Sequence, residues 1–209
     1  MSNTFSSHHP PESIVLDNQA PPPWAVEEYG SKERRTLQCM FNAMGPLAGL
    51  RILESGCGTG LLTMELARQA GPNGCIVAMD TSPQMIAAAR QRLAGFGNVK
   101  IYLGAAETRA RSLGRFDQVI CRQEYSQFID QGKALSTLTN LLNPLGIIII
   151  SHLSSFADIK DNNRKAEVAA SRKMMPDTSQ MRVFCKACGL KIEKWQDDQE
   201  GYLLCARRI

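Results

Sequence analysis

The sequence predicts an α/β fold in which helices cover both faces of a mostly parallel sheet, and three observations support this prediction. Residues 50–60 run from a short apolar segment through a glycine-rich loop into an apolar helical pattern, which is the order strand, tight loop, helix. Residues 75–80 are a second apolar run that ends in Asp80, 20 residues after Gly60, as in a strand–helix–strand unit. The isoleucines at 147–150 fit a strand that is covered on both faces.

The composition is that of a globular protein of one ordinary domain. The chain has 209 residues, of which 44% are hydrophobic and 21% charged, enough to bury a real core. Its net charge of +4 comes from Lys and Arg scattered along the chain, whereas nucleic-acid binding concentrates basic residues, so we expect no nucleic-acid partner. We see neither a secretory leader nor a span-length apolar run, and seven cysteines indicate reduced thiols. We therefore expect a cytoplasmic protein.

The N-terminal part divides into an arm and the start of the domain. Residues 1–23 are rich in proline and serine and are predicted to be a flexible arm, in which His8 and His9 bind no specific metal. The single domain is expected to cover residues 24–209. An amphipathic helix that packs on the sheet is predicted within residues 24–44 from apolar side chains at i, i+3, i+4 and i+7, namely Leu37, Met40, Phe41 and Met44.

The loop after the first strand carries glycine at alternate positions, Gly56, Gly58 and Gly60. Glycine permits a sharp turn and lets the backbone approach a ligand. The loop that cradles a pyrophosphate usually has its third glycine one residue later. Glu54, two residues before the first glycine, would repel phosphates but suits a ligand with a cationic amino group. A tight turn that binds nothing is the alternative at this stage.

Three motifs together point to a known family. Residues 54–60 read Glu-Ser-Gly-Cys-Gly-Thr-Gly and resemble the first motif of class I S-adenosylmethionine-dependent methyltransferases. Residues 80–85, Asp-Thr-Ser-Pro-Gln-Met, resemble the second motif, and residues 116–119, Phe-Asp-Gln-Val, resemble the signature of the fourth strand. The resemblance covers roughly residues 35–208. It implies a Rossmann-like, doubly wound sheet of seven strands whose last strand is antiparallel, with S-adenosyl-L-methionine as cofactor.

The resemblance also implies which residues hold the cofactor. Glu54 would hold its amino group, Asp80 would accept hydrogen bonds from both ribose hydroxyls, and Met85 would lie near the adenine. The alternative for Asp80, a cap for the next helix, is weakened because Ser82 and Pro83 already supply one. The predicted cofactor residues are Glu54, Gly56, Cys57, Gly58, Gly60, Asp80, Thr81, Met85, Ala106, Glu107, Arg122 and Gln127.

Two positions depart from the pattern of the family. Ala105 stands where relatives often have an Asp that binds the adenine amino group, so adenine recognition would depend on the Ala106 N–H, on Glu107 or on a water. Leu145 stands where relatives usually have the first glycine of Lys-Pro-Gly-Gly. We expect the departure at Leu145 to affect only the local structure.

The remaining elements complete the predicted sheet. Strands are predicted at 99–103, 116–121, 147–151, 190–195 and 202–206, with a turn at 143–146. One helix is predicted from Ala134, Leu135, Leu138, Leu141 and Leu142, and another from Met181, Phe184, Cys185 and Cys188, ending at Gly189. Because Cys185 and Cys188 share that helical face and lack partner ligands, we expect core packing and no metal site.

The acceptor should lie beyond the fourth and fifth strands, because ligands of open parallel sheets bind outside the carboxyl ends of the strands. A transfer to oxygen or nitrogen would need a general base unless the acceptor binds deprotonated, and the candidate catalytic residues are Glu124, Tyr125 and His152. The alternative for His152 is a position at the rim of the sheet. A carbon or thiolate acceptor could react without a base. The resemblance implies that Trp24, Tyr29 and Arg34 can cover the cofactor, with packing of their segment on the sheet as the alternative. In the family, insertions such as the polar segment 154–175 often shape the acceptor pocket, but the sequence does not place this one.

The predicted function is methyl transfer from S-adenosylmethionine to a small molecule. A cofactor-binding protein without methyl transfer, such as an accessory subunit, is the alternative, motivated by Ala105 and by the lack of an obvious base. Hydride transfer with a nicotinamide cofactor is disfavoured by the glycine spacing and by Glu54. The sequence does not identify the acceptor, and it does not show whether the protein forms a homodimer.

Overall fold

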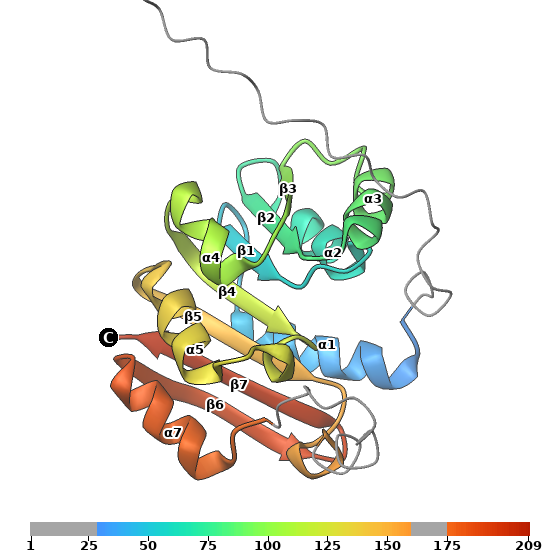
Figure 1. Ribbon diagram of the computed structural model, residues 1–209. Coiled ribbons are helices and arrows are strands. Elements are labelled where there is room, and N and C mark those ends of the chain that lie inside the picture. The colour runs from blue at the N-terminus through green and yellow to red at the C-terminus, as the bar shows by residue number, and fades with distance from the viewer. Residues whose placement is uncertain (1–28, 160–174) are drawn as a thin grey trace, which may run out of the picture.

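The computed structural model of the protein describes residues 29–159 and 175–209. Its strands form one sheet in the order β3-β2-β1-β4-β5-β7-β6 (Figure 1). The strands are β1 (Arg51–Ser55), β2 (Cys75–Asp80), β3 (Val99–Leu103), β4 (Phe116–Arg122), β5 (Leu142–His152), β6 (Leu190–Asp198) and β7 (Gly201–Arg208). The helices are α1 (Ser31–Met44), α2 (Leu61–Ala70), α3 (Pro83–Arg92), α4 (Ala106–Arg109), α5 (Gln131–Asn140) and α7 (Thr178–Ala187), with 3-10 turns η2 (Ala110–Leu113) and η3 (Tyr125–Gln127).

The strand directions confirm the predicted fold class. β3, β2, β1, β4 and β5 are parallel neighbours, while β7 runs antiparallel to β5 and to β6. The chain leaves β1 toward β2 and β3 on one side and returns to β4 on the other. The strand order therefore reverses beside β1, where open α/β sheets bind their ligands.

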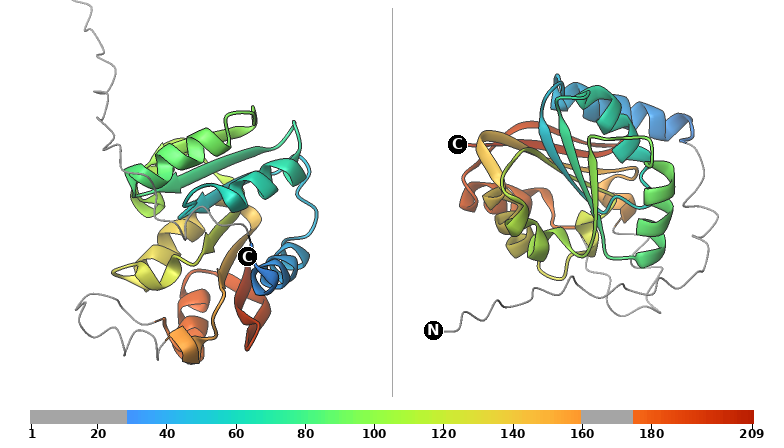
Figure 2. Two further views of the ribbon diagram at one scale, coloured as in Figure 1. Left: turned by 90° about the vertical axis from the view of Figure 1, so that its right-hand side faces the viewer. Right: turned by 90° about the horizontal axis from the view of Figure 1, so that it is seen from above.

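Helices cover both faces of this sheet (Figure 2). Buried side chains of α1 and α2 pack on the face that carries Ile52, Ile120 and Ile149, and Ile86 of α3 packs on the same face through Ala78. The other face is covered by α4, α5 and α7. Both faces of β5 are thus buried, which explains its run of isoleucines.

Polar caps begin three of the helices. Ser82 accepts a hydrogen bond from the Met85 N–H and Pro83 occupies the first turn of α3, which confirms the predicted cap. Asp130 and Asp177 cap α5 and α7 in the same way. These caps fix where the loops at the carboxyl edge of the sheet end.

The region before the fifth strand differs from the prediction. α5 ends at Asn140, and β5 begins at Leu142, within the residues assigned to the preceding helix and before the expected turn. Leu142 pairs with Phe116, and the register then shifts before Gln118 pairs with Ile147, so the four expected turn residues are an irregularity inside the strand. Leu145 takes a positive φ of 64° there, a conformation that glycine adopts more readily.

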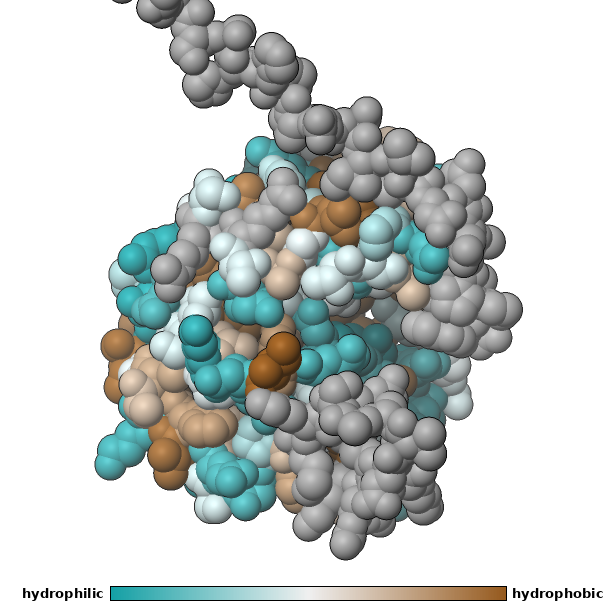
Figure 3. Space-filling view, in the orientation of Figure 1, coloured by the Kyte–Doolittle hydropathy of each residue, from teal (hydrophilic) through white to brown (hydrophobic). Residues whose placement is uncertain are grey.

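Several expectations concern residues that the structure does not describe. Trp24, the arm at 1–23 and most of the segment 154–175 lie outside the described ranges. Within those ranges, no helix is long and apolar enough to cross a membrane. Hydrophilic and hydrophobic residues are interspersed on the face shown in Figure 3.

Candidate active site

A cavity of about 480 Å³ lies at the carboxyl ends of β1, β2 and β4, beside the start of α1. Its size is in the range of small-molecule sites. Nine of the twelve predicted cofactor residues line it. They come from three separate segments of the chain, and their roles stay predictions. The lining residues are Tyr29, Glu33, Glu54, Gly56, Cys57, Gly58, Thr59, Leu61, Leu62, Asp80, Thr81, Ser82, Met85, Arg122, Gln123, Glu124, Gln127 and Leu153.

The glycine loop is shaped mainly by protein contacts. Gly56, Gly58 and Gly60 all have positive φ, of 73°, 53° and 82°. A Cβ on Gly56 would lie 2.7 Å from the carboxyl group of Glu124, and one on Gly60 would lie 2.8 Å from Leu93. Only at Gly58 is the added Cβ free of contacts within 4 Å. The expectation that the glycines make room for a ligand is therefore limited to Gly58.

Asp80 joins the loops that follow β1 and β2. Its carboxylate accepts hydrogen bonds from the backbone N–H of Gly58, at 2.9 Å, and of Ser82, at 2.8 Å. A carboxylate offers about four lone-pair sites, so Asp80 retains acceptor capacity toward the cavity. That capacity fits the two hydroxyls of a ribose.

Glu54 is a buried acid on the cavity wall. Its side chain is 2% exposed, and the Thr63 hydroxyl donates to it at 2.6 Å. Burial raises the pKa of Glu54 to about 8, against opposing effects of the Thr63 hydrogen bond and the Arg122 charge. A cationic amino group at this wall would stabilise the carboxylate form.

Glu124 is the predicted base that the structure brings to the cavity. It follows β4, lies against Gly56 and accepts a hydrogen bond from the Ser55 hydroxyl. Burial raises its pKa to about 7, close to the value that suits proton transfer near neutral pH. The sequence did not reveal the partners Ser55 and Thr63, because only the folded strand and helix bring these hydroxyls to the two acids.

The other two candidate bases do not line the cavity. Tyr125 is fully buried in the core on the opposite face, and its hydroxyl donates to the Gln131 carbonyl at 2.8 Å. His152 is 3% exposed, and burial, aided by the Arg122 charge, lowers its pKa to about 4. Its ring packs edge-on against Tyr202 at 6.3 Å. This burial explains why neither residue reaches the site assigned to it.

Three predicted cofactor residues are absent from the cavity wall. Gly60 begins α2 and packs on α3, and Ala106 is buried in the core beneath α4. Glu107 follows Ala106 in α4, and its Oε2 is buried without a hydrogen-bond partner in the described part of the chain. The expected adenine end is thus the least complete part of the site.

The start of α1 covers one side of the cavity. The Arg122 guanidinium stacks over the Tyr29 ring at 5.3 Å, while Arg34 donates to the Tyr29 carbonyl at 2.9 Å. Gln123, also on the wall, has a positive φ of 62°, and its side-chain oxygen accepts from the Leu153 N–H. Such a strained residue at a cavity is common in functional sites.

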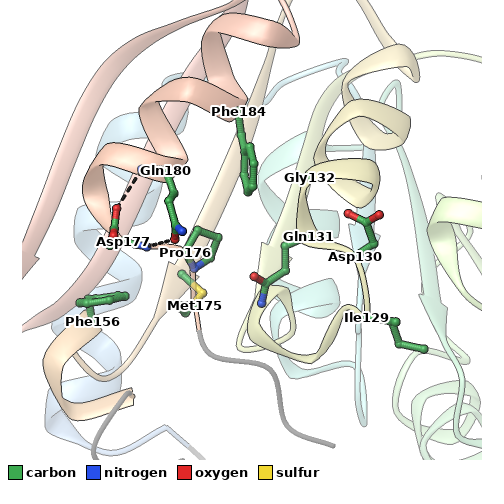
Figure 4. A pocket seen from close by; sticks show the side chains of 10 residues that line it. All are labelled: Ile129, Asp130, Gln131, Gly132, Phe156, Met175, Pro176, Asp177, Gln180 and Phe184. Carbon is green, nitrogen blue, oxygen red and sulfur yellow. Dashed lines mark hydrogen bonds between the residues drawn. The ribbon is translucent and has the colours of Figure 1, made fainter.

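A second cavity, of about 560 Å³, lies between the starts of α5 and α7 (Figure 4). Its two acids are already engaged as helix caps, Asp130 with the Lys133 N–H and Asp177 with the Gln180 N–H. None of the predicted site residues lines it. The first cavity is therefore the candidate site. In the described ranges, no group of three or more His, Cys, Asp or Glu side chains is arranged to hold a metal.

Comparisons with known proteins identify the family of this chain. A family model described as "Methyltransferase domain" matches residues 47–204. The magnesium-protoporphyrin O-methyltransferase of Rhodobacter capsulatus is 33% identical over an alignment of 138 residues, and the match covers 59% of this chain and 60% of the relative. The ubiquinone biosynthesis O-methyltransferase of Azorhizobium caulinodans is 36% identical over 113 residues, 54% of this chain and 44% of the relative.

Solved structures show the same fold. The magnesium protoporphyrin IX methyltransferase of Synechocystis, solved with bound SAH, matches with a TM-score of 0.65 and 20% identity over 86% of this chain and 82% of that one. The chain spans about half the length of the curated relatives named above. Since the family model covers most of the chain, including the glycine loop and Asp80, the protein belongs to the class I S-adenosylmethionine-dependent methyltransferase family.

Proposed function

We propose that the protein transfers a methyl group from S-adenosylmethionine to a small-molecule acceptor in the first cavity. The observation that supports this most directly is the convergence of Glu54, Gly58 and Asp80 on one cavity at the point where the strand order reverses. These three residues come from β1, the glycine loop and the end of β2. Their chemistry matches an amino group, a closely approaching ligand chain and a ribose.

The cofactor would supply an electrophilic methyl group on a sulfonium, with a thioether as leaving group. The residues of this chain would then hold and orient the reactants, which is the main contribution to such a displacement. Glu54 would bind the ammonium group and Asp80 the ribose hydroxyls. Gly58 would let the backbone approach, because its α-carbon faces open space.

For an oxygen or nitrogen acceptor, Glu124 is the base that the geometry favours. Its carboxyl group lies on the cavity wall with a pKa of about 7, so a large fraction is ionised near neutral pH. The Ser55 hydroxyl donates to it and fixes its orientation. Glu124 would take the acceptor's proton as the new bond to carbon forms. The names of the two O-methyltransferase relatives favour an oxygen atom as the acceptor.

The sheet, the cysteines and the charge distribution support proposals about the domain organisation, the compartment and the partners of the protein. We infer a single domain over residues 24–209 after the arm at 1–23, since the described part forms one sheet. All seven cysteines are unpaired, which supports a reducing compartment such as the cytoplasm. The dispersed positive charge favours a small molecule over nucleic acid. We also propose that the protein forms a homodimer, and its mass in sedimentation experiments tests this.

Calorimetric titration tests the cofactor first. The wild-type protein should bind S-adenosylmethionine and S-adenosylhomocysteine with micromolar Kd and should not bind NAD. Asp80→Ala should lose both adenosyl ligands, because it removes the ribose acceptor and the anchor of Gly58. Arg68→Gln, on the exposed side of α2, is the control. Failure of wild type to bind either adenosyl ligand would refute the proposal.

A transfer assay then tests the reaction. Radiolabelled methyl groups from S-adenosylmethionine should appear in small phenols, hydroquinones or carboxylic acids presented as a panel. Glu124→Gln should lower the rate constant kcat by roughly 100-fold with little change in cofactor Kd, if Glu124 acts as the base. Tight cofactor binding without transfer to any acceptor, including a metabolite extract, would instead favour a binding protein.

A further inference from the structure

The two ends of α1 are attached to the rest of the protein in different ways. At the C-terminal end, the Met44 carbonyl accepts a hydrogen bond from the buried Gln118 side chain at 3.0 Å, and Met40 and Met44 are buried in the core. At the other end, the helix begins at Ser31, two residues after the cavity residue Tyr29. The C-terminal end is therefore anchored, and the position of Tyr29 depends on contacts near the start of the helix.

Some of these contacts come from the turn that joins β6 to β7, more than 160 residues away in the chain. The Thr36 hydroxyl donates to the Glu200 carbonyl at 2.9 Å, and the Arg35 guanidinium pairs with the Glu200 carboxylate at 3.0 Å. Thr36 also lies 3.1 Å from the Lys32 carbonyl, a common contact for a threonine within a helix. Thr36 is buried, whereas the ion pair is exposed and contributes little. The Thr36 hydrogen bond is thus the stronger link to the turn.

The same turn also packs against the end of β5, which borders the cavity. Gly201 has a φ of 126°, and a Cβ there would clash with the His152 carbonyl oxygen and lie 3.2 Å from the Leu153 carbonyl carbon. Leu153 lines the cavity, and its N–H donates to the side chain of Gln123, another lining residue. The turn therefore contacts two segments of the cavity wall, although none of its own described residues lines the cavity.

Building on the proposed function, we propose that Thr36 and Glu200 form a latch that holds the start of α1 over the cavity while the cofactor is bound. In this closed position Tyr29 stacks on Arg122 at 5.3 Å. Opening the latch breaks few contacts and leaves the C-terminal end of α1 in the core. Thr36 and Glu200 touch no reactant, so they are positioning residues that act through Tyr29, and release of the latch lets the ligands exchange.

The alternative is that these contacts only stabilise the fold. Their loss would then lower the free energy of unfolding but leave the rate of ligand release unchanged. A latch instead sets the balance between a closed and an open start of α1, so its loss raises the open population. The expected increase is about fivefold, the factor that corresponds to one hydrogen bond.

Surface plasmon resonance with immobilised protein and S-adenosylhomocysteine tests the latch. Thr36→Val keeps the shape of the side chain but removes the hydroxyl, and should raise the dissociation rate constant about fivefold. Thr36→Ser keeps the donor and should stay within about twofold of wild type. Arg35→Gln should have an effect below about twofold, because its ion pair is exposed.

Thr139→Val is the matched control. Thr139 is also a buried threonine within a helix, but its hydroxyl has no hydrogen-bond partner in the described ranges and it does not line the cavity. This variant should release S-adenosylhomocysteine at the wild-type rate. A fivefold faster release from Thr139→Val would show that any buried threonine has this effect, and would overturn the latch.

Hydrogen exchange of the protein without ligand tests the latch independently of the cofactor. Amides in the first two turns of α1 should exchange about fivefold faster in Thr36→Val than in wild type, whereas amides beside Met40 and Met44 should be unchanged. If release stays at the wild-type rate, or exchange rises equally along α1, the latch is wrong while the proposed function stands. If wild type binds no S-adenosylhomocysteine, the proposed function fails, and the exchange contrast still decides for or against the latch.

Discussion

The two parts of the carboxyl edge of the sheet differ in how completely their polar groups are satisfied. Around the ends of β1 and β2, Asp80 accepts two backbone N–H groups and Glu54 accepts the Thr63 hydroxyl. Around the ends of β4 and β5 and the start of β7, four buried polar atoms lack a hydrogen-bond partner within the described ranges. They are Arg122 Nη2, Ser151 Oγ, His152 Nε2 and Tyr202 Oη.

This difference affects how each region can respond to a bound ligand. A satisfied network holds one shape, which suits the binding of the same cofactor in every turnover. Unsatisfied buried groups cost free energy, and a bound ligand or water can recover it. Arg122 and Ser151 are cross-strand neighbours, as are His152 and Tyr202. The second region therefore has buried polar groups that a bound ligand could satisfy.

Substitution of Gly56 should have the largest effect on stability, because Gly56 lies in the hydrogen-bonded region at the ends of β1 and β2. In Gly56→Ala the new Cβ would lie 2.7 Å from the Glu124 carboxyl group, at a φ of 73°. We expect the free energy of unfolding to fall by roughly 3 kcal/mol from clash and backbone strain together, measured by urea denaturation. Gly58→Ala is the control, with positive φ but open space around the Cβ, and should cost only about 1 kcal/mol. Equal losses would show that the contact with Glu124 can relax.

Removal of the Glu54 charge should have a smaller effect that depends on pH. The pKa of this carboxyl is about 8 in the folded protein, against 4.5 for an unperturbed glutamate side chain. Between these values the folded state binds more protons than the unfolded state, so the free energy of unfolding of wild type falls as pH rises from about 4.5 to 8. Glu54→Gln removes the Glu54 part of this loss while keeping an acceptor for Thr63, and the part that comes from Glu124, with its pKa of about 7, remains. Above pH 8 the variant without ligand should therefore be more stable than wild type.

Thermal and urea unfolding across pH 4 to 9 would measure the Glu54 effect. Glu65→Gln, a partly exposed acid that pairs with Arg68 on α2, should keep the pH profile of wild type. Wild-type stability that does not decline toward pH 8 would show that Glu54 is ionised without cost. The surroundings of Glu54 would then stabilise its negative charge as well as satisfy its hydrogen bonds.

The sequence predicted the first region better than the second, for physical reasons. Alternating glycines, a capped helix and an acid at a strand end are local patterns, and β2 and β3 have the predicted bounds. Tyr125 was misplaced because a three-residue 3-10 turn is too short to show a periodicity that tells which way its side chain points. The early start of β5 depends on pairing with Phe116, a contact 26 residues away in the chain. The hydrogen bond from Ser55 to Glu124 is likewise nonlocal.

A pair of buried tyrosines gives the smallest effect, because it isolates the cost of one unpartnered hydroxyl, the property that distinguishes the two regions. Tyr125 and Tyr202 belong to the same core cluster. The Tyr125 hydroxyl donates to Gln131 at 2.8 Å, whereas the Tyr202 hydroxyl has no partner among the described residues. Tyr125→Phe should lower the free energy of unfolding by about 1 kcal/mol, and Tyr202→Phe should leave it unchanged or raise it by less than about 1 kcal/mol. Both values come from urea denaturation of the protein without ligand. A loss at Tyr202 equal to that at Tyr125 would mean that a water molecule satisfies the Tyr202 hydroxyl. The two regions would then differ in solvation. Ordered water would satisfy the polar groups near the end of β5 and the start of β7, whereas direct hydrogen bonds satisfy those at the ends of β1 and β2.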